Sequence, residues 1–185
     1  DCDTYAMITV GTGIGTGIVF NGRPAQSRGM GSEWGHMLAL TPGLSKDRGA
    51  HYDRSVEGIA SGTGVIRRAR ARGFKGEHSG ELAAAARSGD PIASDIFREA
   101  SEALASLLYS LSLGFHPEKF LMSGGMLALR DVFLPQTIEL YTDLMKRKNA
   151  AFLAPVQIAK LGNNAGVIGA ARLPYLESSW PEKTI

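Results

Sequence analysis

The chain opens on short apolar runs rich in β-branched residues, and these runs predict a β-hairpin. Residues 5–10 (YAMITV) and residues 18–20 (IVF) flank the glycine-rich segment 11–17 (GTGIGTG). Apolar runs of this length and composition favour strands. Asn21 and Gly22 follow, and this pair is a strong signal for a two-residue hairpin turn. The pattern therefore predicts two strands joined by a glycine-rich turn, with a second tight turn after them.

Apolar residues that recur every three or four positions predict helices through the middle and end of the chain. The expected helices span residues 57–72, 79–87, 92–114, 132–148 and 165–173. Gly73 is a stop signal for the first helix, Ser79 is expected to cap the second, and Pro91 begins the longest one. Pro174 is expected to end the last helix.

Two more short apolar runs, 120–122 and 156–159, predict strands between the later helices. Two strands, a set of helices and then two strand–helix units predict an α/β fold, with a mixed sheet flanked by helices. The length of 185 residues suits one domain. Residues 26–55 carry many turn formers and no clear period, and so long a connection favours a role in ligand handling.

Composition and charge narrow the function classes only slightly. Apolar residues make up 44% of the chain and charged residues 21%, so a sizeable core can form. The formal net charge is +2, and the one basic cluster comprises Arg67, Arg68, Arg70 and Arg72. On a helix these residues spread over more than one face, which favours a solvated surface over a nucleic-acid patch. We therefore expect no direct binding of nucleic acid by this chain.

The single cysteine and the start of the chain bear on compartment and completeness. Cys2 alone cannot form an internal disulfide or a cysteine-rich zinc site, and it is compatible with a reducing cytoplasm. No apolar run reaches about 18 residues, so no membrane span is expected. The chain begins with Asp1 in place of Met and enters a strand almost at once. We expect it to be a processed, excised or truncated piece of a longer protein.

The glycine-rich segment 11–17 is the first candidate for ligand binding. Glycines leave backbone N–H groups open to a phosphate, and the hydroxyls of Thr12 and Thr16 add donors. No helix is predicted after the segment, which argues against a dinucleotide-binding fold. It also lacks the Gly-Lys-Ser/Thr ending of a Walker A loop. The alternative is a tight glycine-rich hairpin that binds nothing.

Acidic and imidazole side chains provide two more candidates. Glu33 and His36 could reach one polyol, because a carboxylate accepts from hydroxyls and an imidazole donates or accepts. A lone histidine is more often an ordinary surface or core group. Glu57 stands at the start of a predicted helix, where a carboxylate also simply suits the positive end of the helix dipole.

Small residues mark two candidate contacts in the second half of the chain. Gly124 and Gly125 follow a predicted strand and would let a flat ligand lie against the backbone, although an ordinary strand-to-helix turn explains them equally well. Residues 161–166 (LGNNAG) would let the last helix pack close to the sheet, and packing alone is their alternative role.

Taken in order, these segments resemble the ROK family, named for repressors, open reading frames and sugar kinases. Residues 10–18 resemble the family's second phosphate-binding segment, and residues 33–36 (EWGH) match its Glu-x-Gly-His sugar-contact motif. Residues 120–125 (FLMSGG) resemble its adenosine-contact strand and turn, and residues 161–171 resemble its terminal helix. The resemblance implies the actin-like, ribonuclease H-like ATPase fold, in which two lobes close on ATP and a sugar.

The resemblance also implies roles for particular residues. It implies contacts to sugar hydroxyls at Glu33, His36 and Glu57. It implies contacts to the ATP phosphates at Gly11, Thr12 and Gly13, and to the adenosine at Gly124 and Gly125. The ligands it implies are ATP with Mg²⁺ and a hexose or N-acetylhexosamine, bound by a cytoplasmic homodimer.

Two departures from the family pattern limit what the chain alone is expected to do. The family's amino-terminal lobe, with its Asp-x-Gly-x-Thr phosphate loop and catalytic Asp, has no counterpart here, so residues 1–185 are expected to be a carboxy-terminal lobe without its own catalytic residue. Many members also bind zinc through three cysteines and the histidine that is His36 here. The cysteine positions become Arg48, Ala50 and Ser55, so neither zinc nor another metal is expected.

The leading functional hypothesis is therefore an ATP-dependent, glucokinase-like sugar kinase of which this chain is the carboxy-terminal half, inactive by itself. The alternative is the sugar-binding effector domain of a ROK-type transcriptional regulator, with its DNA-binding region upstream. A catalytically dead scaffold that keeps the fold is the third. The intact Gly11, Thr12 and Gly13 favour the kinase, because residues of this kind serve ATP phosphates rather than the sugar.

Overall fold

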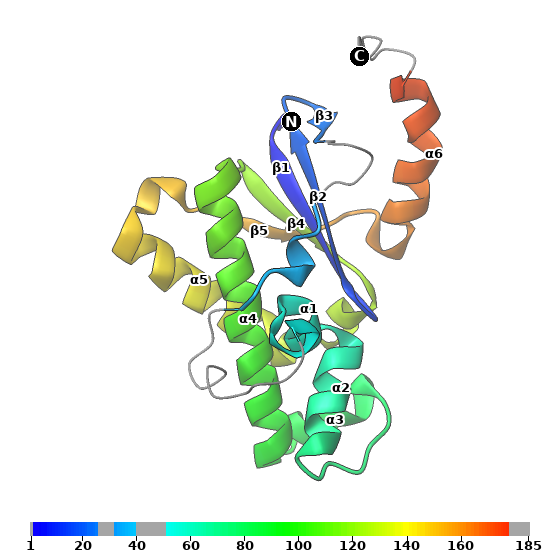
Figure 1. The fold of residues 1–185 in the computed structure, drawn as a ribbon, viewed down its shortest axis with the longest axis vertical. Helices are drawn as coiled ribbons and strands as arrows, with labels where there is room; N and C mark the ends of the chain where they lie inside the picture. The colour runs from blue at the N-terminus through cyan, green and yellow to red at the C-terminus, as the bar shows by residue number, and fades with distance from the viewer. Residues whose placement is uncertain (1, 26–31, 40–50, 178–185) are drawn as a thin grey trace.

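A computed structural model of the chain describes residues 2–25, 32–39 and 51–177, and it contains a five-stranded mixed sheet (Figure 1). The strand order is β3-β2-β1-β4-β5. The strands are β1 Tyr5–Val10, β2 Ile14–Phe20, β3 Arg23–Pro24, β4 Lys119–Ser123 and β5 Val156–Ile158. The first three strands are antiparallel neighbours, whereas β1 pairs with β4 and β4 with β5 in parallel. The predicted mixed sheet is confirmed.

Both predicted hairpin turns are present, but the first is shorter than expected, because β2 begins at Ile14 and not at Ile18. The glycine-rich turn joins β1 to β2, with Val10 opposite Ile14 in the register. The second turn joins β2 to β3 through Asn21 and Gly22, which have φ angles of 51° and 74°. Positive φ at both central residues is what a two-residue turn of this twist requires, and Asn and Gly tolerate it best.

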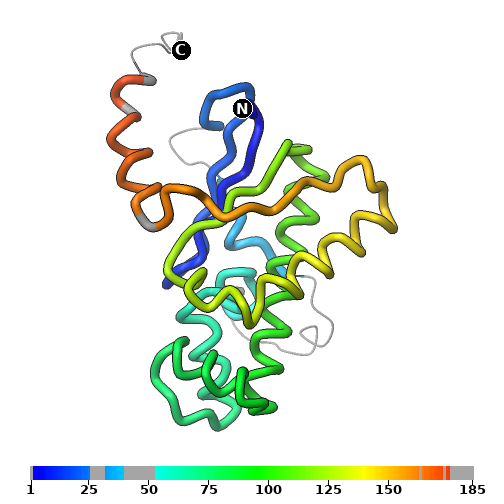
Figure 2. The backbone as a smooth tube through the Cα atoms, turned by 180° about the vertical axis from the view of Figure 1, so that it is seen from behind, coloured from blue at the N-terminus to red at the C-terminus, as the bar shows by residue number. Residues whose placement is uncertain are grey.

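Helices account for most of the remaining described chain. The α-helices are α1 Val56–Ala60, α2 Gly62–Ala71, α3 Ser79–Arg87, α4 Pro91–Phe115, α5 Leu134–Lys148 and α6 Ala165–Glu177. Short 3₁₀ segments are η1 Trp34–His36, η3 His51–Arg54, η4 Gly125–Val132, η5 Ala150–Phe152 and η6 Gly162–Asn164. Seen from behind, α6 stands apart from the other helices, beyond the sheet (Figure 2).

One face of the sheet forms the core together with α4 and α5. Ile8 of β1 and Phe120 of β4 are fully buried, whereas their sequence neighbours on the opposite face are only partly buried. The ring of Phe120 meets the ring of Tyr141 on α5 edge-on, with centroids 5.8 Å apart. The Tyr141 hydroxyl lies 2.7 Å from Oγ of Ser112 on α4 and accepts from the backbone N–H of Ala154. This hydroxyl links α4 and α5 to the segment that leads into β5.

The predicted helix over residues 57–72 is wrong in one respect, because it is two helices that meet at Ser61. The backbone of Ser61 is extended, with φ −73° and ψ 163°, so α1 ends there and α2 begins. The buried Ser61 N–H donates to the Glu57 carbonyl, while its Oγ accepts from Gly64 N–H at 3.0 Å. A serine that closes one helix and caps the next satisfies groups from both ends at once.

Three other helix boundaries also differ from the prediction. His78, not Ser79, precedes the first residue of α3, and Ser79 is helical. The helix predicted from residue 132 begins at Leu134, because the preceding residues form η4 and Phe133 departs from helical geometry with φ −139°. Pro174 does not end α6, which continues to Glu177 with the proline inside it. A helix can pass through a proline at the cost of one backbone hydrogen bond.

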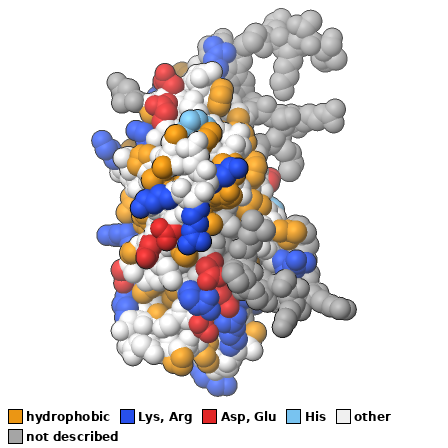
Figure 3. All heavy atoms as spheres, turned by 90° about the vertical axis from the view of Figure 1, so that its left-hand side faces the viewer, with side chains coloured by type: hydrophobic (Ala, Val, Ile, Leu, Met, Phe, Trp, Pro, Cys, Tyr) orange, Lys and Arg blue, Asp and Glu red, His pale blue; other side chains and the backbone are white. Residues whose placement is uncertain are grey.

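The arginines of α2 are largely engaged in ion pairs with neighbouring elements. Arg68 and Arg72 both bond Glu99 of α4, at 2.7 and 2.6 Å, and Arg67 bonds Asp53 at 2.6 Å. The Arg68 side chain is only 10% exposed, so the expectation of a solvated surface is wrong for this residue. On the face drawn in Figure 3, basic and acidic side chains are interspersed. No helix in the described part of the chain is both long and apolar enough to cross a membrane.

Glu118 joins the start of β1 to the start of β4. Its carboxylate accepts hydrogen bonds from the backbone N–H groups of Asp3 and Thr4, both at 2.9 Å. The bond from Thr4, followed by that from Asp3, holds the pKa of Glu118 below its ordinary value. These bonds favour the ionised form, so they contribute stability at neutral pH that is lost as the pH falls through the lowered pKa.

We expect Glu118→Gln to lower the thermal unfolding midpoint at pH 7, because the neutral amide accepts the two N–H bonds less strongly. The difference from the natural protein should shrink as the pH falls below the ordinary carboxyl pKa of 4.5. Calorimetry between pH 3 and pH 7 measures both effects. Glu139→Gln, the same change on the exposed side of α5, is the control; an equal loss there would show that the bonds to β1 are not the cause.

Candidate functional site

The turn between β1 and β2 is held by backbone and side-chain groups from the α1–α2 segment. Gly11 N–H donates within the turn to the Gly13 carbonyl at 2.9 Å. The Gly11 carbonyl accepts from Gly62 N–H at the start of α2, at 2.7 Å. The Ile14 N–H donates to Oε2 of Glu57 in α1, also at 2.7 Å. The turn is therefore a supported structure, with a bond to a neighbouring helix at each end.

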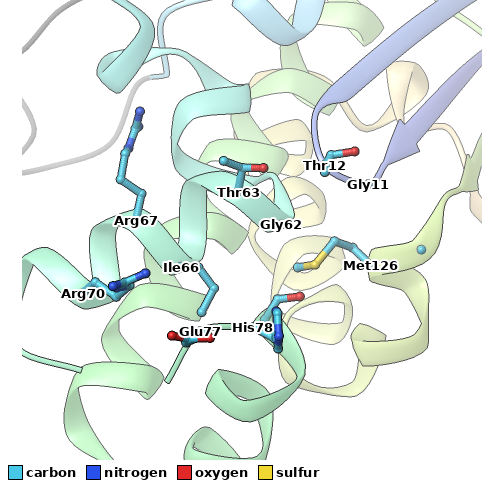
Figure 4. Close-up of a pocket in the computed structure, with 12 residues that line it drawn as sticks. Gly11, Thr12, Gly62, Thr63, Ile66, Arg67, Arg70, Glu77, His78 and Met126 are labelled. Carbon is cyan, nitrogen blue, oxygen red and sulfur yellow. The ribbon is translucent and has the colours of Figure 1, made fainter. Parts of the chain in front are cut away.

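A cavity of about 720 Å³ opens between this turn, α2, the segment before α3, and η4 (Figure 4). Its lining residues are Gly11, Thr12, Gly62, Thr63, Ile66, Arg67, Arg70, Glu77, His78, Ser79, Gly125 and Met126. Thr12 and Thr63 lie toward one end in Figure 4, and Glu77 and His78 lie at the other. Ile66 and Met126 extend into the space between, from α2 and from η4. One end is thus polar and glycine-lined, and the middle is apolar.

Several lining residues of this larger cavity were not singled out by the sequence. Ile66, Glu77 and His78 belong to this group. A signal existed for the α2 residues, because positions 63, 66, 67 and 70 fall on one helix face once the start of α2 is placed beside the turn. No comparable signal existed for Glu77 and His78, since only the tertiary packing of the segment before α3 brings them to the cavity.

A second cavity of about 400 Å³ is lined by residues of the same turn. Its lining residues are Thr9, Gly11, Thr12, Gly13, Ile14, Gly15, Glu33, Glu57 and Gly124. Six of the residues proposed from the sequence therefore meet in one concavity, namely Gly11, Thr12, Gly13, Glu33, Glu57 and Gly124. Gly11 and Thr12 line both cavities, so the two cavities adjoin at the glycine turn.

The η1 segment carries Glu33 and His36 to the edge of the smaller cavity. Trp34 N–H donates to Oγ1 of Thr16 at 3.1 Å, and that hydroxyl donates to the Ser32 carbonyl. The Thr16 hydroxyl therefore anchors η1, and the expectation that it serves a phosphate is wrong. A Cβ at Gly35 would stand 2.2 Å from the Ile14 carbonyl oxygen, so only glycine lets η1 approach β2 this closely.

Glu33 and His36 are both accessible, but only one of them reaches a cavity. Nε2 of His36 lies 3.8 Å from Oε2 of Glu33, and the two side chains are 50% and 61% exposed respectively. Glu33 lines the smaller cavity, whereas His36 is not among the residues that line either cavity. His36 therefore joins the site through its pairing with Glu33.

Gly124 brings the end of β4 against the end of β1. Its φ of +104° is one that L side chains rarely adopt, and a Cβ there would stand 2.4 Å from the Val10 carbonyl oxygen. Gly125 follows with open space at its Cβ position and lines the larger cavity. β1 and β4 are parallel neighbours, so residues that follow the two strands meet at the same edge of the sheet.

Of the three positions that hold cysteine in the family's zinc motif, the structure describes Ser55, and this residue has another role. Ser55, which stands where the family pattern has its third cysteine, is buried and caps α1 by accepting from Gly58 N–H at 3.0 Å. Arg48 and Ala50 lie outside the described residues. Among the described residues, no group of three or more His, Cys, Asp or Glu side chains is placed to hold a metal ion.

Comparison with known proteins places this chain and its fold in a family. The chain matches the ROK family over residues 1–175. A kanosamine kinase from Amycolatopsis mediterranei is 31% identical over 176 residues, which cover 95% of this chain and 57% of that kinase. A ROK hexokinase from Thermus thermophilus has a TM-score of 0.83 at 30% identity, covering 96% of this chain and 60% of the hexokinase. A ROK family glucokinase from Streptomyces griseus, in complex with glucose and AMPPNP, has a TM-score of 0.75 at 30% identity, covering 93% and 60%.

The chain belongs to the ROK family, as its segments indicated. Its α/β fold is the one shared by ROK sugar kinases, so the expected actin-like lobe is confirmed. A ROK family transcriptional regulator has the same fold, with a TM-score of 0.63 at 23% identity. The chain spans 57% of the kanosamine kinase and 60% of each of the two kinase structures.

We expect Gly124→Ala to reduce the free energy of unfolding by about 1–3 kcal/mol, the usual cost of a side chain in a disfavoured backbone region. The close approach to Val10 adds to the strain. Chemical denaturation measures the loss. Gly125→Ala is the matched control, because its added methyl group meets open space; equal destabilisation of the two variants would contradict the steric explanation.

Proposed function

We propose that the chain is the carboxy-terminal lobe of an ATP-dependent sugar kinase that phosphorylates a hexose or an N-acetylhexosamine. The observation that carries this proposal is the glycine turn shared by the two cavities. A phosphoryl donor and an acceptor hydroxyl must meet within a few ångströms, and one turn between two adjoining spaces supports such a meeting. The ROK kinases to which the chain is similar support the same reaction class.

The smaller cavity is the proposed sugar site. Glu33 and Glu57 contribute carboxylates, which accept hydrogen bonds from hydroxyl groups and give them direction. His36, paired with Glu33, extends the polar edge and can donate to a sugar oxygen. Two carboxylates suit a neutral, hydroxyl-rich ligand better than an anion, because like charges repel.

The larger cavity is the proposed nucleotide site. Gly11 and Thr12 line this cavity and would face the phosphates with backbone N–H groups and a hydroxyl, and Gly125 would lie beside the adenosine. Gly13 and Gly124, which the family resemblance also assigns to ATP, line the smaller cavity instead. Ile66 and Met126 supply apolar surface on which a flat base can pack. The glucokinase from Streptomyces griseus, crystallised with glucose and the ATP analogue AMPPNP, supports ATP as the donor.

In the proposed reaction, the oxygen of a sugar hydroxyl attacks the terminal phosphorus of ATP. A new P–O bond forms to the sugar, the bond to the bridging oxygen of ADP breaks, and the hydroxyl proton passes to a base. The family resemblance assigns that base to an Asp of an amino-terminal lobe, which would also help the phosphates to hold Mg²⁺. The residues of this chain bind and orient the two substrates, in a protein that we propose is a cytoplasmic homodimer.

A sugar-responsive regulator is the second candidate function, because a ROK family transcriptional regulator has the same fold. The two candidates differ in what they need from the larger cavity. A regulator that only senses sugar needs the smaller cavity alone, whereas a kinase needs both. The glycine and threonine lining at the junction of the two cavities favours the kinase.

We expect the full-length protein to release ADP from ATP only when one hexose or N-acetylhexosamine is present. A coupled assay with glucose, N-acetylglucosamine and N-acetylmannosamine in turn tests this expectation. Tight binding of one sugar, without ADP release in its presence, would favour the regulator. ADP release that requires no sugar would contradict both candidates.

Glu33→Ala and His36→Ala should each weaken sugar binding in the full-length protein, while the affinity for an ATP analogue stays within about twofold. Loss of a hydrogen bond to a charged group costs about 1.5–3 kcal/mol, which corresponds to roughly tenfold to a hundredfold in the sugar dissociation constant for Glu33. Isothermal titration calorimetry measures both affinities. Unchanged sugar binding in both variants would remove these residues from the site.

Ile66→Ala should have the opposite pattern, with weaker nucleotide binding and unchanged sugar binding. Removing three carbons from a half-buried apolar contact costs roughly 1–2 kcal/mol, or about tenfold in the nucleotide dissociation constant. The same titrations of an ATP analogue and of the sugar measure it. Inorganic triphosphate provides the control ligand, since it lacks a base and should bind both forms equally.

A further inference from the structure

We infer that Glu57 is a positioning residue for the phosphate-binding turn as well as a sugar ligand, and that it thereby couples sugar affinity to nucleotide affinity. This inference rests on the proposed function and adds to it a link between the two sites. The larger and smaller cavities adjoin at the turn, but adjoining cavities need not influence each other. A residue that is bonded to the turn and also lines the sugar cavity provides a physical connection.

The carboxylate of Glu57 lies directly against the turn. Its Oε2 accepts from Ile14 N–H at 2.7 Å. A Cβ at Gly13 would stand 2.5 Å from the same oxygen and 3.2 Å from Cδ, so the absence of a side chain at Gly13 is what admits the carboxylate. Glu57 also lines the smaller cavity, where a sugar hydroxyl can donate to the carboxylate.

The element that carries Glu57 is held firmly. α1 begins at the buried, capping Ser55 and ends at the buried Ser61, and Ile59 between them is fully buried. A few residues further on, Gly62 N–H donates to the Gly11 carbonyl at 2.7 Å. One rigid segment therefore holds the turn at both ends, at Gly11 and at Ile14. A shift of the Glu57 carboxylate acts on the turn, because the helix behind it does not yield.

The segment that carries Glu33 and His36 approaches the same residue, Ile14, at its carbonyl. Gly35, between Glu33 and His36, passes so close to the Ile14 carbonyl that a Cβ would stand 2.2 Å from its oxygen. Ile14 is thus bonded through its N–H to Glu57 and packed at its carbonyl against η1. The contact of Gly35 with Ile14 is steric and involves no sugar ligand, whereas the contact of Glu57 is a hydrogen bond from a proposed sugar ligand, so Glu57 is the residue expected to transmit a change.

A sugar hydroxyl bonded to Glu57 restricts the carboxylate to orientations in which Oε2 still accepts from Ile14. The turn then spends less of its time in shapes that cannot receive a phosphate, and nucleotide affinity rises. Because linkage between two ligands is reciprocal, the nucleotide raises sugar affinity by the same factor. Coupling free energies of this kind usually correspond to factors of about 5 to 150.

The test compares two shortened carboxylates in the full-length protein. We measure the dissociation constant of a non-hydrolysable ATP analogue by calorimetry, without sugar and with a saturating sugar substrate. The coupling ratio is the constant without sugar divided by the constant with sugar. The natural protein should show a ratio of at least about 5. Glu57→Asp, too short to reach Ile14, should bring the ratio to within about twofold of 1. Glu33→Asp is the matched control and should weaken sugar binding while it keeps the ratio.

Glu57→Gln provides a second, milder variant, because its amide oxygen can still accept from Ile14 N–H. It should weaken sugar binding and keep a ratio close to that of the natural protein. Circular dichroism and the unfolding midpoint establish that each variant is folded before its ratio is interpreted. A purely structural role for Glu57 would move the midpoint and both affinities together, without a selective loss of the ratio.

The outcomes separate this inference from the proposed function. A natural protein that binds both ligands with a ratio of 1 overturns the coupling and leaves the kinase proposal standing. The coupling is also overturned if the Glu57→Asp variant keeps the ratio of the natural protein. The same holds if Glu33→Asp lowers the ratio as much as Glu57→Asp does. A natural protein that binds neither ligand overturns the proposed function, and the inference with it.

Discussion

The hydrogen bond from Ile14 N–H to the Glu57 carboxylate joins the two halves of the candidate site. It joins the first β-hairpin to α1, and the two residues that it links are separated by 43 positions in the chain. The bond from Gly62 to Gly11 makes a second crossing from the same segment. These two bonds hold the glycine-rich turn at both ends, and the turn contributes to the walls of both cavities.

Backbone approaches that only glycine allows are the condition for this arrangement. Gly13 admits the Glu57 carboxylate, Gly35 admits the Ile14 carbonyl, and Gly124 crosses Val10 with a positive φ. Each of these glycines brings two segments together that are distant in sequence. At these three positions glycine serves close packing rather than freedom of movement, because other atoms surround the place of a Cβ.

Much of the fold could be predicted because its signals are local. The two hairpin turns, the long helix α4 and the strands β4 and β5 follow from β-branched runs, from a helical period and from turn residues that act over a few positions. Predictions failed where two local signals overlapped. Ser61 ends one helix and caps the next, whereas the periodic pattern alone predicts one continuous helix across it.

By itself the sequence determined the elements, the family, and a short set of polar and glycine residues with the chemistry for a sugar and a phosphate. Only the tertiary structure decided which of those residues share a cavity: Glu33 and Glu57 meet beside the turn, His36 stays at the edge, and Thr16 is used to anchor η1. The reason is physical. Residue type fixes what a side chain can bond, whereas the parallel pairing of β1 with β4 and the close glycine contacts decide what lies within reach.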